Sequence, residues 1–210
     1  MNVLVACEFS GIVRNAFRNK GHDAWSCDLL PALDNSEYHI QGDVLQQLGS
    51  RWDLMIAHPP CTYLCNSGVR WLHGNKNYIE NNPLTGRAYE IEEENRIQER
   101  WTKMYEAVRF FNELSYNSRI NKVCVENPIP HKYAKYYIGE YTQLIQPWQF
   151  GHGETKATCL WLQNLPELVP TNIVEGREPR IHRMAPSKDR GLMRSITYQG
   201  IANAMAEQWG

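Results

Sequence analysis

The sequence predicts an α/β fold in which helices cover both faces of a mostly parallel sheet. Short apolar runs alternate with helical patterns over residues 2–60, and each run stops at a turn. The runs are apolar throughout instead of alternating with polar residues, which is typical of strands buried on both faces. The chain has 210 residues, so it can build one sizeable core, and we expect residues 1–210 to form a single domain.

The first third of the chain contains three of the expected strands. Apolar runs mark the strands, and a glycine at position 21 ends the helical pattern that follows the first run. The expected order is a strand over residues 3–7, a helix over 11–19, a strand over 24–27 that ends at Asp28, a short helix at 45–48 and a strand over 54–57.

The rest of the chain is less regular. Residues 62–95 are rich in glycine, asparagine and proline, and we expect a long mobile loop there, which in a compact domain is usually functional. Apolar residues recur at three- and four-residue steps over 97–114, which predicts the best-defined helix. Four prolines make residues 164–195 loop-like. The remaining expected elements are strands over 122–125 and 158–162 and a closing helix over 201–209.

Composition places the chain among ordinary globular proteins. Hydrophobic residues make up 42% and charged residues 21%, and no stretch approaches the roughly 18 to 20 apolar residues that cross a bilayer. We find no signal segment, so we expect a cytoplasmic protein without a membrane partner. The six cysteines form no Cys-x-x-Cys pair, which fits a reducing compartment and predicts no metal site.

The net charge of -1 is weak for a protein that grips the DNA backbone. The charge is unevenly distributed, however, because residues 177–194 carry six basic and two acidic side chains. Such a segment can bind phosphates even when the whole chain is nearly neutral. We take Arg180, Arg183 and Arg190 as candidate substrate contacts, and a merely solvated loop is the alternative.

Three motifs stand where apolar runs give way to turns. They are Glu-Phe-Ser-Gly at 8–11, His-Pro-Pro-Cys at 58–61 and Glu-Asn-Pro at 126–128. Parallel strands would bring the thiol of Cys61 and the carboxylate of Glu126 to one sheet edge, beside a glycine turn that can receive a nucleotide-like cofactor. Since carbon 6 of a pyrimidine is a poor electrophile, its attack needs a fixed thiolate and a polar group on the ring.

In this order the motifs resemble the DNA cytosine-5 methyltransferase family, in a compact phage-type form without a large target-recognition domain. The resemblance implies a Rossmann-like S-adenosylmethionine-dependent methyltransferase fold. It also implies that Cys61 attacks carbon 6 of cytosine and that Glu126, with a raised pKa, holds ring nitrogen 3. Asn127 and Pro60 would position the loops. Pro128 stands where the family has valine.

The same resemblance implies the cofactor contacts. The family pattern is Phe-x-Gly-x-Gly-Gly, and this chain keeps only its first glycine, with Val13 and Arg14 in place of the others. Asp28 would bind ribose hydroxyls, and Asp43 would meet the adenine amine. Lys156 is a weak candidate for an arginine of the family. The implied contacts of S-adenosylmethionine are Phe9, Ser10, Gly11, Asp28, Asp43, Pro60 and Asn203.

The implied function is methyl transfer to carbon 5 of cytosine in DNA, in a bacterial or phage-infected host cell. The base must leave the stack to be attacked, and loop 62–95 would close over it. Residues 164–195 would be a reduced recognition segment. Because that segment is short, a free pyrimidine nucleotide or RNA is an alternative substrate. A degenerate member that binds nucleic acid or a host protein without catalysis is a third possibility.

Overall fold

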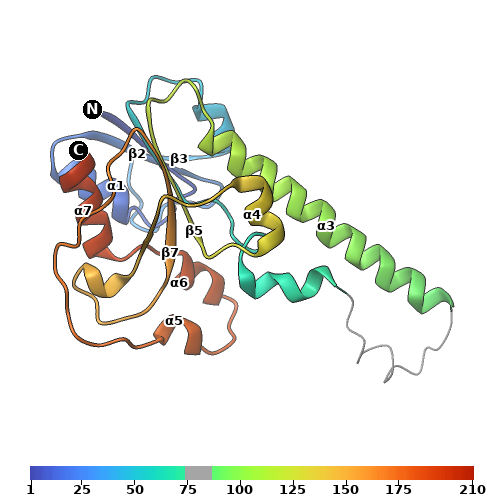
Figure 1. The fold of residues 1–210 in the computed structure, drawn as a ribbon. Helices are drawn as coiled ribbons and strands as arrows, with labels where there is room; N and C mark the ends of the chain where they lie inside the picture. The colour runs from blue at the N-terminus through green and yellow to red at the C-terminus, as the bar shows by residue number, and fades with distance from the viewer. Residues whose placement is uncertain (74–86) are drawn as a thin grey trace.

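The computed structural model describes residues 1–73 and 87–210, with the backbone alone at 87–92. The seven strands of these residues form one sheet in the order β3-β2-β1-β4-β5-β7-β6 (Figure 1). The neighbours from β3 to β5 are parallel, whereas β7 pairs antiparallel with β5 and β6. The strands are β1 (Asn2–Ala6), β2 (Asp23–Asp28), β3 (His39–Gln41), β4 (Leu54–Ala57), β5 (Lys122–Pro128), β6 (Gln143–Ile145) and β7 (Thr158–Gln163).

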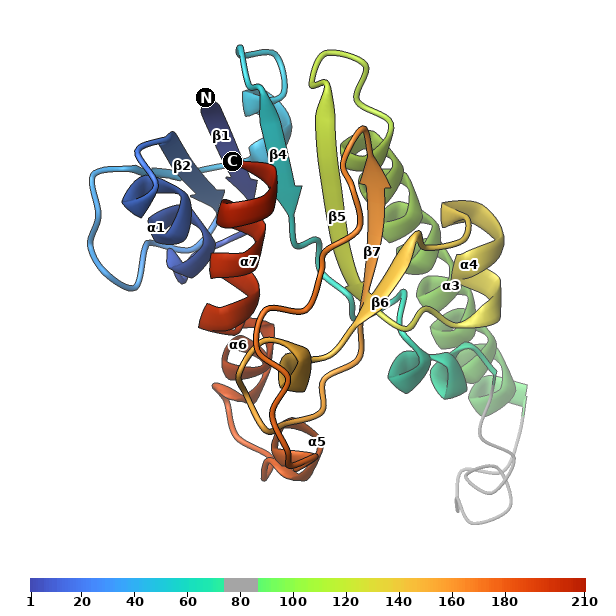
Figure 2. The ribbon, with the colours of Figure 1, turned by 60° about the vertical axis from the view of Figure 1, so that its left-hand side comes forward.

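Helices lie on both faces of the sheet, which confirms the predicted Rossmann-like α/β fold (Figure 2). α1 (Ile12–Asn19) and α7 (Gln199–Trp209) cover one face, and α3 (Arg87–Ser115) and α4 (Lys132–Ile138) cover the other. Successive side chains of a strand point to opposite faces, so each central strand contributes to both cores. This is why the runs are apolar without alternation.

The sequence does not predict β3, β6 or α4. Each of the two strands has only three residues, too few to show a periodic pattern, so pairing with a neighbour defines them. α4 begins behind His131, whose Nδ1 accepts a hydrogen bond from the N–H of Ala134 at 3.0 Å. Histidine is an uncommon N-terminal cap, so the usual start signal is missing.

The loop expected over residues 62–95 is shorter than predicted. Residues Asn66–Leu72 form a 3-10 helix, η2, and α3 already begins at Arg87. The glycines and asparagines of this region therefore do not exclude helical structure at its two described ends. The central part of the expected loop, residues 74–86, lies outside the described residues.

Residues 164–195 also contain helical structure that the prolines conceal. α5 (Arg180–Arg183) and α6 (Arg190–Ser195) are short helices in this segment. At four and six residues they are too short for an apolar period to appear. Two further 3-10 helices are η1 (Val44–Gln47) and η3 (Pro147–Gln149). Among the described residues, no helix is both long and apolar enough to cross a membrane.

Candidate active site

β4 and β5 are neighbours in the sheet, so the residues at and just after their carboxyl ends lie at the same edge of the sheet. Ala57 is the parallel partner of Val125. The next residue of each chain segment, His58 in one and Glu126 in the other, therefore lies at the same level. The His-Pro-Pro-Cys and Glu-Asn-Pro motifs reach this edge together.

His58 and Glu126 form a buried ion pair between the two motifs. Nδ1 of His58 lies 2.8 Å from Oε2 of Glu126, and each side chain is only 11% exposed. Apart from this contact, Nε2 of His58 and Oε2 of Glu126 have no hydrogen-bond partner among the described residues. Buried polar atoms are nearly always satisfied in folded proteins, so this pair has unused hydrogen-bonding capacity at the centre of the site.

The ion pair determines the charge of both groups. Burial alone would raise the pKa of Glu126, but the charge of His58, and more weakly that of Lys156, lowers it below its ordinary value. Burial alone would lower the pKa of His58, but the charge of Glu126 raises it above its ordinary value. The contact therefore favours the charged forms of both groups, imidazolium and carboxylate. The raised pKa expected for Glu126 is wrong, because the charge of His58 outweighs burial.

Backbone contacts fix the loop that carries Cys61 beside the strand end that carries Glu126. The N–H of His131, three residues past β5, donates to the carbonyl of Leu64 at 2.9 Å. Nε2 of the same histidine lies 2.9 Å from the carbonyl oxygen of Tyr63. The buried His131 thus joins the loop that follows β4 to the segment that follows β5.

The thiols of Cys61 and Cys65 lie close enough to shift each other's pKa. The contact with Cys65, followed by burial, raises the pKa of Cys61, while Arg194 acts in the opposite direction. The contact with Cys61 lowers the pKa of Cys65 against the effect of burial, aided by Ser67 and by the N–H of Gly68. Cys65 precedes η2, and its Sγ lies 3.0 Å from Oγ of Ser67. The thiolate of the pair therefore forms first on Cys65.

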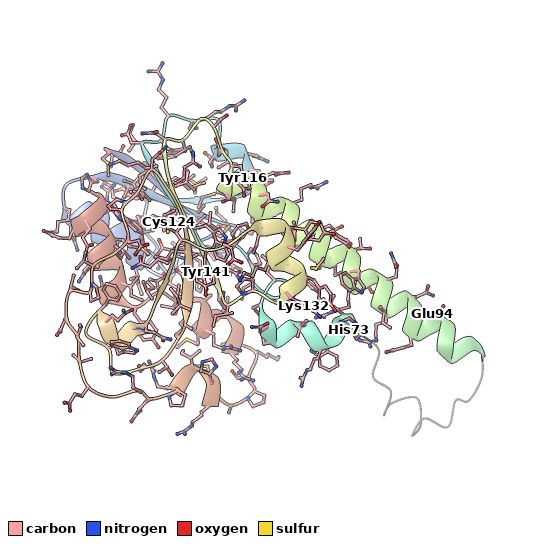
Figure 3. The ribbon with its side chains drawn as sticks, viewed as in Figure 1. His73, Glu94, Tyr116, Cys124, Lys132 and Tyr141 are labelled. Atoms are coloured by element: carbon pink, nitrogen blue, oxygen red, sulfur yellow. The ribbon has the colours of Figure 1, made fainter. Side chains whose placement is uncertain are left out.

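The other four cysteines are poor nucleophiles. Cys124 lies within the sheet (Figure 3), fully buried, and burial followed by the charge of Glu126 raises its pKa. Burial is also the main cause of the raised pKa values of Cys27 and Cys159, both about 11. Because thiols react as thiolates, the Cys61–Cys65 pair holds the reactive sulfur of the described site.

Asp28, Asp43 and the exposed Leu29 lie at the carboxyl ends of β2 and β3. The N–H of Gly42 donates to the carbonyl of Asp28 at 2.8 Å, which brings Asp43 beside the end of β2. The charges of both acids reach Cys7, whose pKa burial and then Asp28 raise to about 12. Leu29 follows Asp28 and is 73% exposed. Acceptors beside an exposed apolar surface suit a ligand such as adenosine, which has hydroxyl and amine donors and an apolar ring face.

The buried side chain of Arg14 packs against the glycine turn that follows β1. Gly11 has a φ of +73°, and a Cβ at this position would lie 2.2 Å from Nη2 of Arg14. The arginine is fully buried, donates to Oγ of Ser26 at 2.8 Å and forms an ion pair with Asp34. Gly11 is thus required by the packing of Arg14, which stands where the family pattern has a glycine.

The backbone N–H groups of the first turn of α1 form hydrogen bonds within the protein. The carboxylate of Glu8 accepts from the N–H groups of Val13 at 2.7 Å and Arg14 at 3.2 Å. The Ser10 hydroxyl donates to the same carboxylate at 3.2 Å, and Phe9 is buried beneath the turn. A helix start usually offers such N–H groups to anions, and here Glu8 occupies them.

The predicted cofactor contacts therefore fit in part. Asp28, Asp43 and Leu29 suit the adenosine half of S-adenosylmethionine. The amino-acid half of that molecule finds no free N–H group in the first three residues of α1, because Ser10 accepts from Ile12 and Glu8 accepts from Val13 and Arg14. Among the described residues, no three His, Cys, Asp or Glu side chains cluster closely enough to hold a metal ion.

The other predicted site residues of the strand ends and of α7 are Asn127, Pro60 and Asn203. Asn127 is buried, and its Nδ2 donates to the carbonyl of Pro128 at 2.6 Å, while its Oδ1 has no partner among the described residues. Asn203 is exposed on α7 and accepts from Gln199 at 2.8 Å, and no hydrogen bond among the described residues joins it to Gly11 or Asp28. Pro60 lines a shallow groove together with Tyr63, Lys103, Glu106, Ala107 and Phe110.

The basic segment lies beyond the carboxyl ends of β1 and β4, where Figure 2 shows α5 and α6. Arg180 is 61% exposed and pairs with Glu154 at 2.7 Å, and Arg183 is exposed. Arg190 is half-buried, and its Nε has no partner among the described residues. Arg194, on the same helix, is close enough to lower the pKa of Cys61. The charge of this one residue of the segment therefore acts on Cys61.

Two residues of the site are missed by sequence reasoning. His58 has a signal that could find it, since it precedes Pro-Pro-Cys directly and parallel pairing of β4 and β5 sets it level with Glu126. Arg194 has no local signal, because only the folding of α6 over the strand ends brings it near Cys61. Lys156, a weak candidate in the sequence, does lie near enough to act on both His58 and Glu126.

No protein-family model matches the chain, and no curated protein sequence matches it significantly. Several solved structures resemble it. One is an E. coli protein described as a DNA modification methyltransferase encoded within a prophage, with 12% identity and a TM-score of 0.46, covering 89% of this chain and 55% of the other. The methyltransferase EhMeth of Entamoeba histolytica has 15% identity and a TM-score of 0.47, covering 83% and 57%.

A DNMT2 variant of Spodoptera frugiperda has 14% identity and a TM-score of 0.40, covering 85% of this chain and 55% of the other. This chain thus spans little more than half of each of these structures. With TM-scores below 0.5 and identities of at most 15%, these likenesses carry no argument about the substrate or the cofactor of this chain.

Proposed function

We propose that the protein transfers a methyl group from S-adenosylmethionine to carbon 5 of a cytosine in DNA, through a covalent adduct on Cys61. The observation that carries this proposal is that the loop with Cys61 follows β4 directly, and that His58 at the start of this loop contacts the buried Glu126 on the neighbouring parallel strand. The reaction needs a sulfur nucleophile for carbon 6 and a polar group for ring nitrogen 3, held at a fixed separation. The two joined loops supply both.

The chain's own residues have defined tasks in this reaction. Cys61 forms the bond from Sγ to carbon 6, and its proton passes to the thiolate of Cys65. Glu126 donates a proton to ring nitrogen 3, so that the electrons of the carbon 5–carbon 6 bond become available at carbon 5. S-adenosylmethionine, when bound, supplies the electrophilic methyl group. A water molecule then takes the proton from carbon 5, the electrons of that bond restore the double bond between carbons 5 and 6, and Cys61 leaves as a thiolate that regains its proton from Cys65.

A cofactor would be held mainly through its adenosine half. Asp28 is expected to accept from the ribose hydroxyls and Asp43 from the adenine amine, while Leu29 covers the ring. The contacts predicted for Phe9, Ser10, Gly11, Pro60 and Asn203 remain part of the proposal. The closed turn at Arg14 favours a second candidate, a degenerate protein that binds nucleic acid or a host protein without transferring a methyl group.

DNA is the favoured substrate because residues 177–194 carry six basic side chains, and the charge of one of them, Arg194, acts on Cys61. A flipped base would enter there, and arginines of α5 and α6 would hold the phosphates beside it. The net charge of -1 and the small size of this segment favour the alternatives, a free pyrimidine nucleotide or an RNA. Methyl transfer to duplex DNA, single strands, RNA and dCMP separates all these candidates, and no transfer to any of them favours the degenerate protein.

Replacing Arg180, Arg183 and Arg190 together with alanine should weaken DNA binding equally for all sequences, because phosphate contacts carry no base information. The slope of log affinity against log salt should become flatter by about 0.9 for each phosphate that the variant no longer binds. Arg51→Ala is the control, since this exposed residue precedes β4 at the other edge of the sheet. An unchanged slope, with dCMP methylated better than duplex DNA, would favour the nucleotide substrate.

Asp43→Ala should weaken binding of S-adenosylhomocysteine about ten- to a hundred-fold, the effect of losing one charge-assisted hydrogen bond. Since Asp43 also accepts from the N–H of Leu45 at 3.0 Å, Asp43→Asn is needed beside it to keep this cap while removing the charge. Calorimetric titration gives both dissociation constants. Glu37→Ala, at an exposed acid of the loop before β3, should leave them unchanged. Equal affinity in wild type and Asp43→Ala would rule out the adenine contact.

A further inference from the structure

The ion pair of His58 and Glu126 leaves a chemical requirement open. Glu126 can assist at ring nitrogen 3 only if it brings a proton, and near neutral pH its carboxyl group is ionised, since the charge of His58 outweighs burial. His58 can supply this proton, because its Nδ1 lies 2.8 Å from Oε2 of Glu126.

We propose that His58 is a positioning residue that stores, within its ion pair with Glu126, the proton that Glu126 delivers to ring nitrogen 3 of the substrate. The inference rests on the proposed function and names a residue that acts through Glu126. The geometry supports it, because both side chains are nearly enclosed and a proton shared between them exchanges poorly with water. Nε2 of His58 is enclosed as well, so His58 reaches the base only through Glu126.

One proton moves from His58 through Glu126 to the base and later returns. In the resting protein His58 carries two ring protons and Glu126 none. When cytosine binds at Glu126, the Nδ1 proton of His58 moves to the carboxylate, and the carboxyl group protonates ring nitrogen 3 as Cys61 attacks carbon 6. The proton returns along the same route when the product forms. His58 is neutral during the covalent stage, and no other reactant is needed.

Charges from each neighbouring strand act on this pair. Glu126 from β5 and Glu8 from the turn behind β1 raise the pKa of His58, whereas burial, the largest single effect, and Lys156 from the segment before β7 lower it. The net shift is upward. The stored proton is therefore present below the raised pKa of His58 and is lost as the pH rises through it. Activity should fall on the alkaline side with this titration.

His58→Gln removes the stored proton and keeps a polar side chain of similar size. At pH 8 we expect methyl transfer to fall about a hundred-fold, the usual contribution of a positioned proton donor. At pH 6 the loss should be much smaller, because Glu126 is then protonated in part by itself. The alkaline limb of the rate profile should move down by about one pH unit or more, since a carboxyl group holds its proton less tightly than imidazole does.

His22→Gln is the matched control, because His22 titrates beside the N-terminal amine at the opposite end of β1, 3.4 Å away. It should leave the rate profile unchanged. An equal loss at all pH values in His58→Gln, with the alkaline limb in its place, would reduce His58 to a structural role and overturn the inference.

A titration of the histidine ring signals by NMR tests the pair without any methylation. The pKa of His58 should fall in Glu126→Gln, while the signal of His22 should stay in place and report an intact fold. An unmoved His58 signal would overturn the inference even if the enzyme is active. A wild-type protein that shows the coupling but methylates no cytosine would instead overturn the proposed function, and the proton-storing role with it.

Discussion

Cys61→Ala is expected to yield no covalent complex with an oligonucleotide that carries 5-fluorocytosine. In the wild type the fluorine cannot leave carbon 5 as a proton does, so the bond between Cys61 and carbon 6 persists and the complex survives denaturation. Without the sulfur no such bond can form, and the rate of methyl transfer should fall on the order of 10³-fold or more. Gel electrophoresis of the denatured complex, with S-adenosylmethionine present, gives the result directly.

Cys65→Ala is the necessary companion, because Cys65 is the more acidic thiol of the pair. If Cys65 accepts the proton of Cys61, its loss should slow formation of the complex without preventing it. A complex that persists in Cys61→Ala and disappears in Cys65→Ala would make Cys65 the nucleophile. Binding of S-adenosylhomocysteine should be nearly the same in both variants, since neither thiol lies among Asp28, Asp43 and Leu29.

Asp34→Ala is expected to cause the largest loss of stability, about 3 kcal/mol in the free energy of unfolding. Arg14 is fully buried, and its other side-chain hydrogen bonds are to the neutral Ser26 and Asn15. Removing Asp34 would leave a buried positive charge without the carboxylate it contacts. We place the loss at the lower end of the range for such changes, because Asp34 is itself 36% exposed. Urea denaturation followed by tryptophan fluorescence measures it.

Two further variants separate the charge effect from simple truncation. Asp23→Ala removes a surface ion pair with Arg18, 3.6 Å long with the carboxylate 62% exposed, and should cost at most about 1 kcal/mol. Arg14→Met in the Asp34→Ala background removes the stranded charge and should restore part of the lost stability. A cost of Asp34→Ala equal to that of Asp23→Ala would show that Arg14 finds water or another acceptor.

The same contact depends on pH in a definite direction. Burial alone would raise the pKa of Asp34, but the hydrogen bond from Asn15 and the charge of Arg14 lower it below its ordinary value. Its contribution is therefore complete at neutral pH and is lost as the pH falls through the lowered value. Because the loop behind β2 carries both Asp34 and Leu29, loss of this anchor should also weaken cofactor binding.

Much of this architecture follows from local sequence. The apolar runs of β1, β4 and β5 are uninterrupted because both faces of these strands are covered, and that property is visible without a structure. Parallel strands end at one edge, so the motifs with Cys61 and Glu126 had to arrive together. The short elements β3, β6, α5 and α6 carry no period of their own, and only their packing against neighbours defines them.

The chemical state of the site was decided by the tertiary structure. A pKa depends on burial and on the distance between charges, and residues far apart in sequence set both. His58 meets Glu126 across 68 positions of the printed sequence, and this contact reverses the pKa shift that burial alone would produce. Arg14 looks like a lost glycine in the sequence, yet in the fold it is a buried charge that requires Gly11 beside it. The sequence by itself determined which groups reach the edge of the sheet, and their contacts in the folded chain determined which of them carry protons.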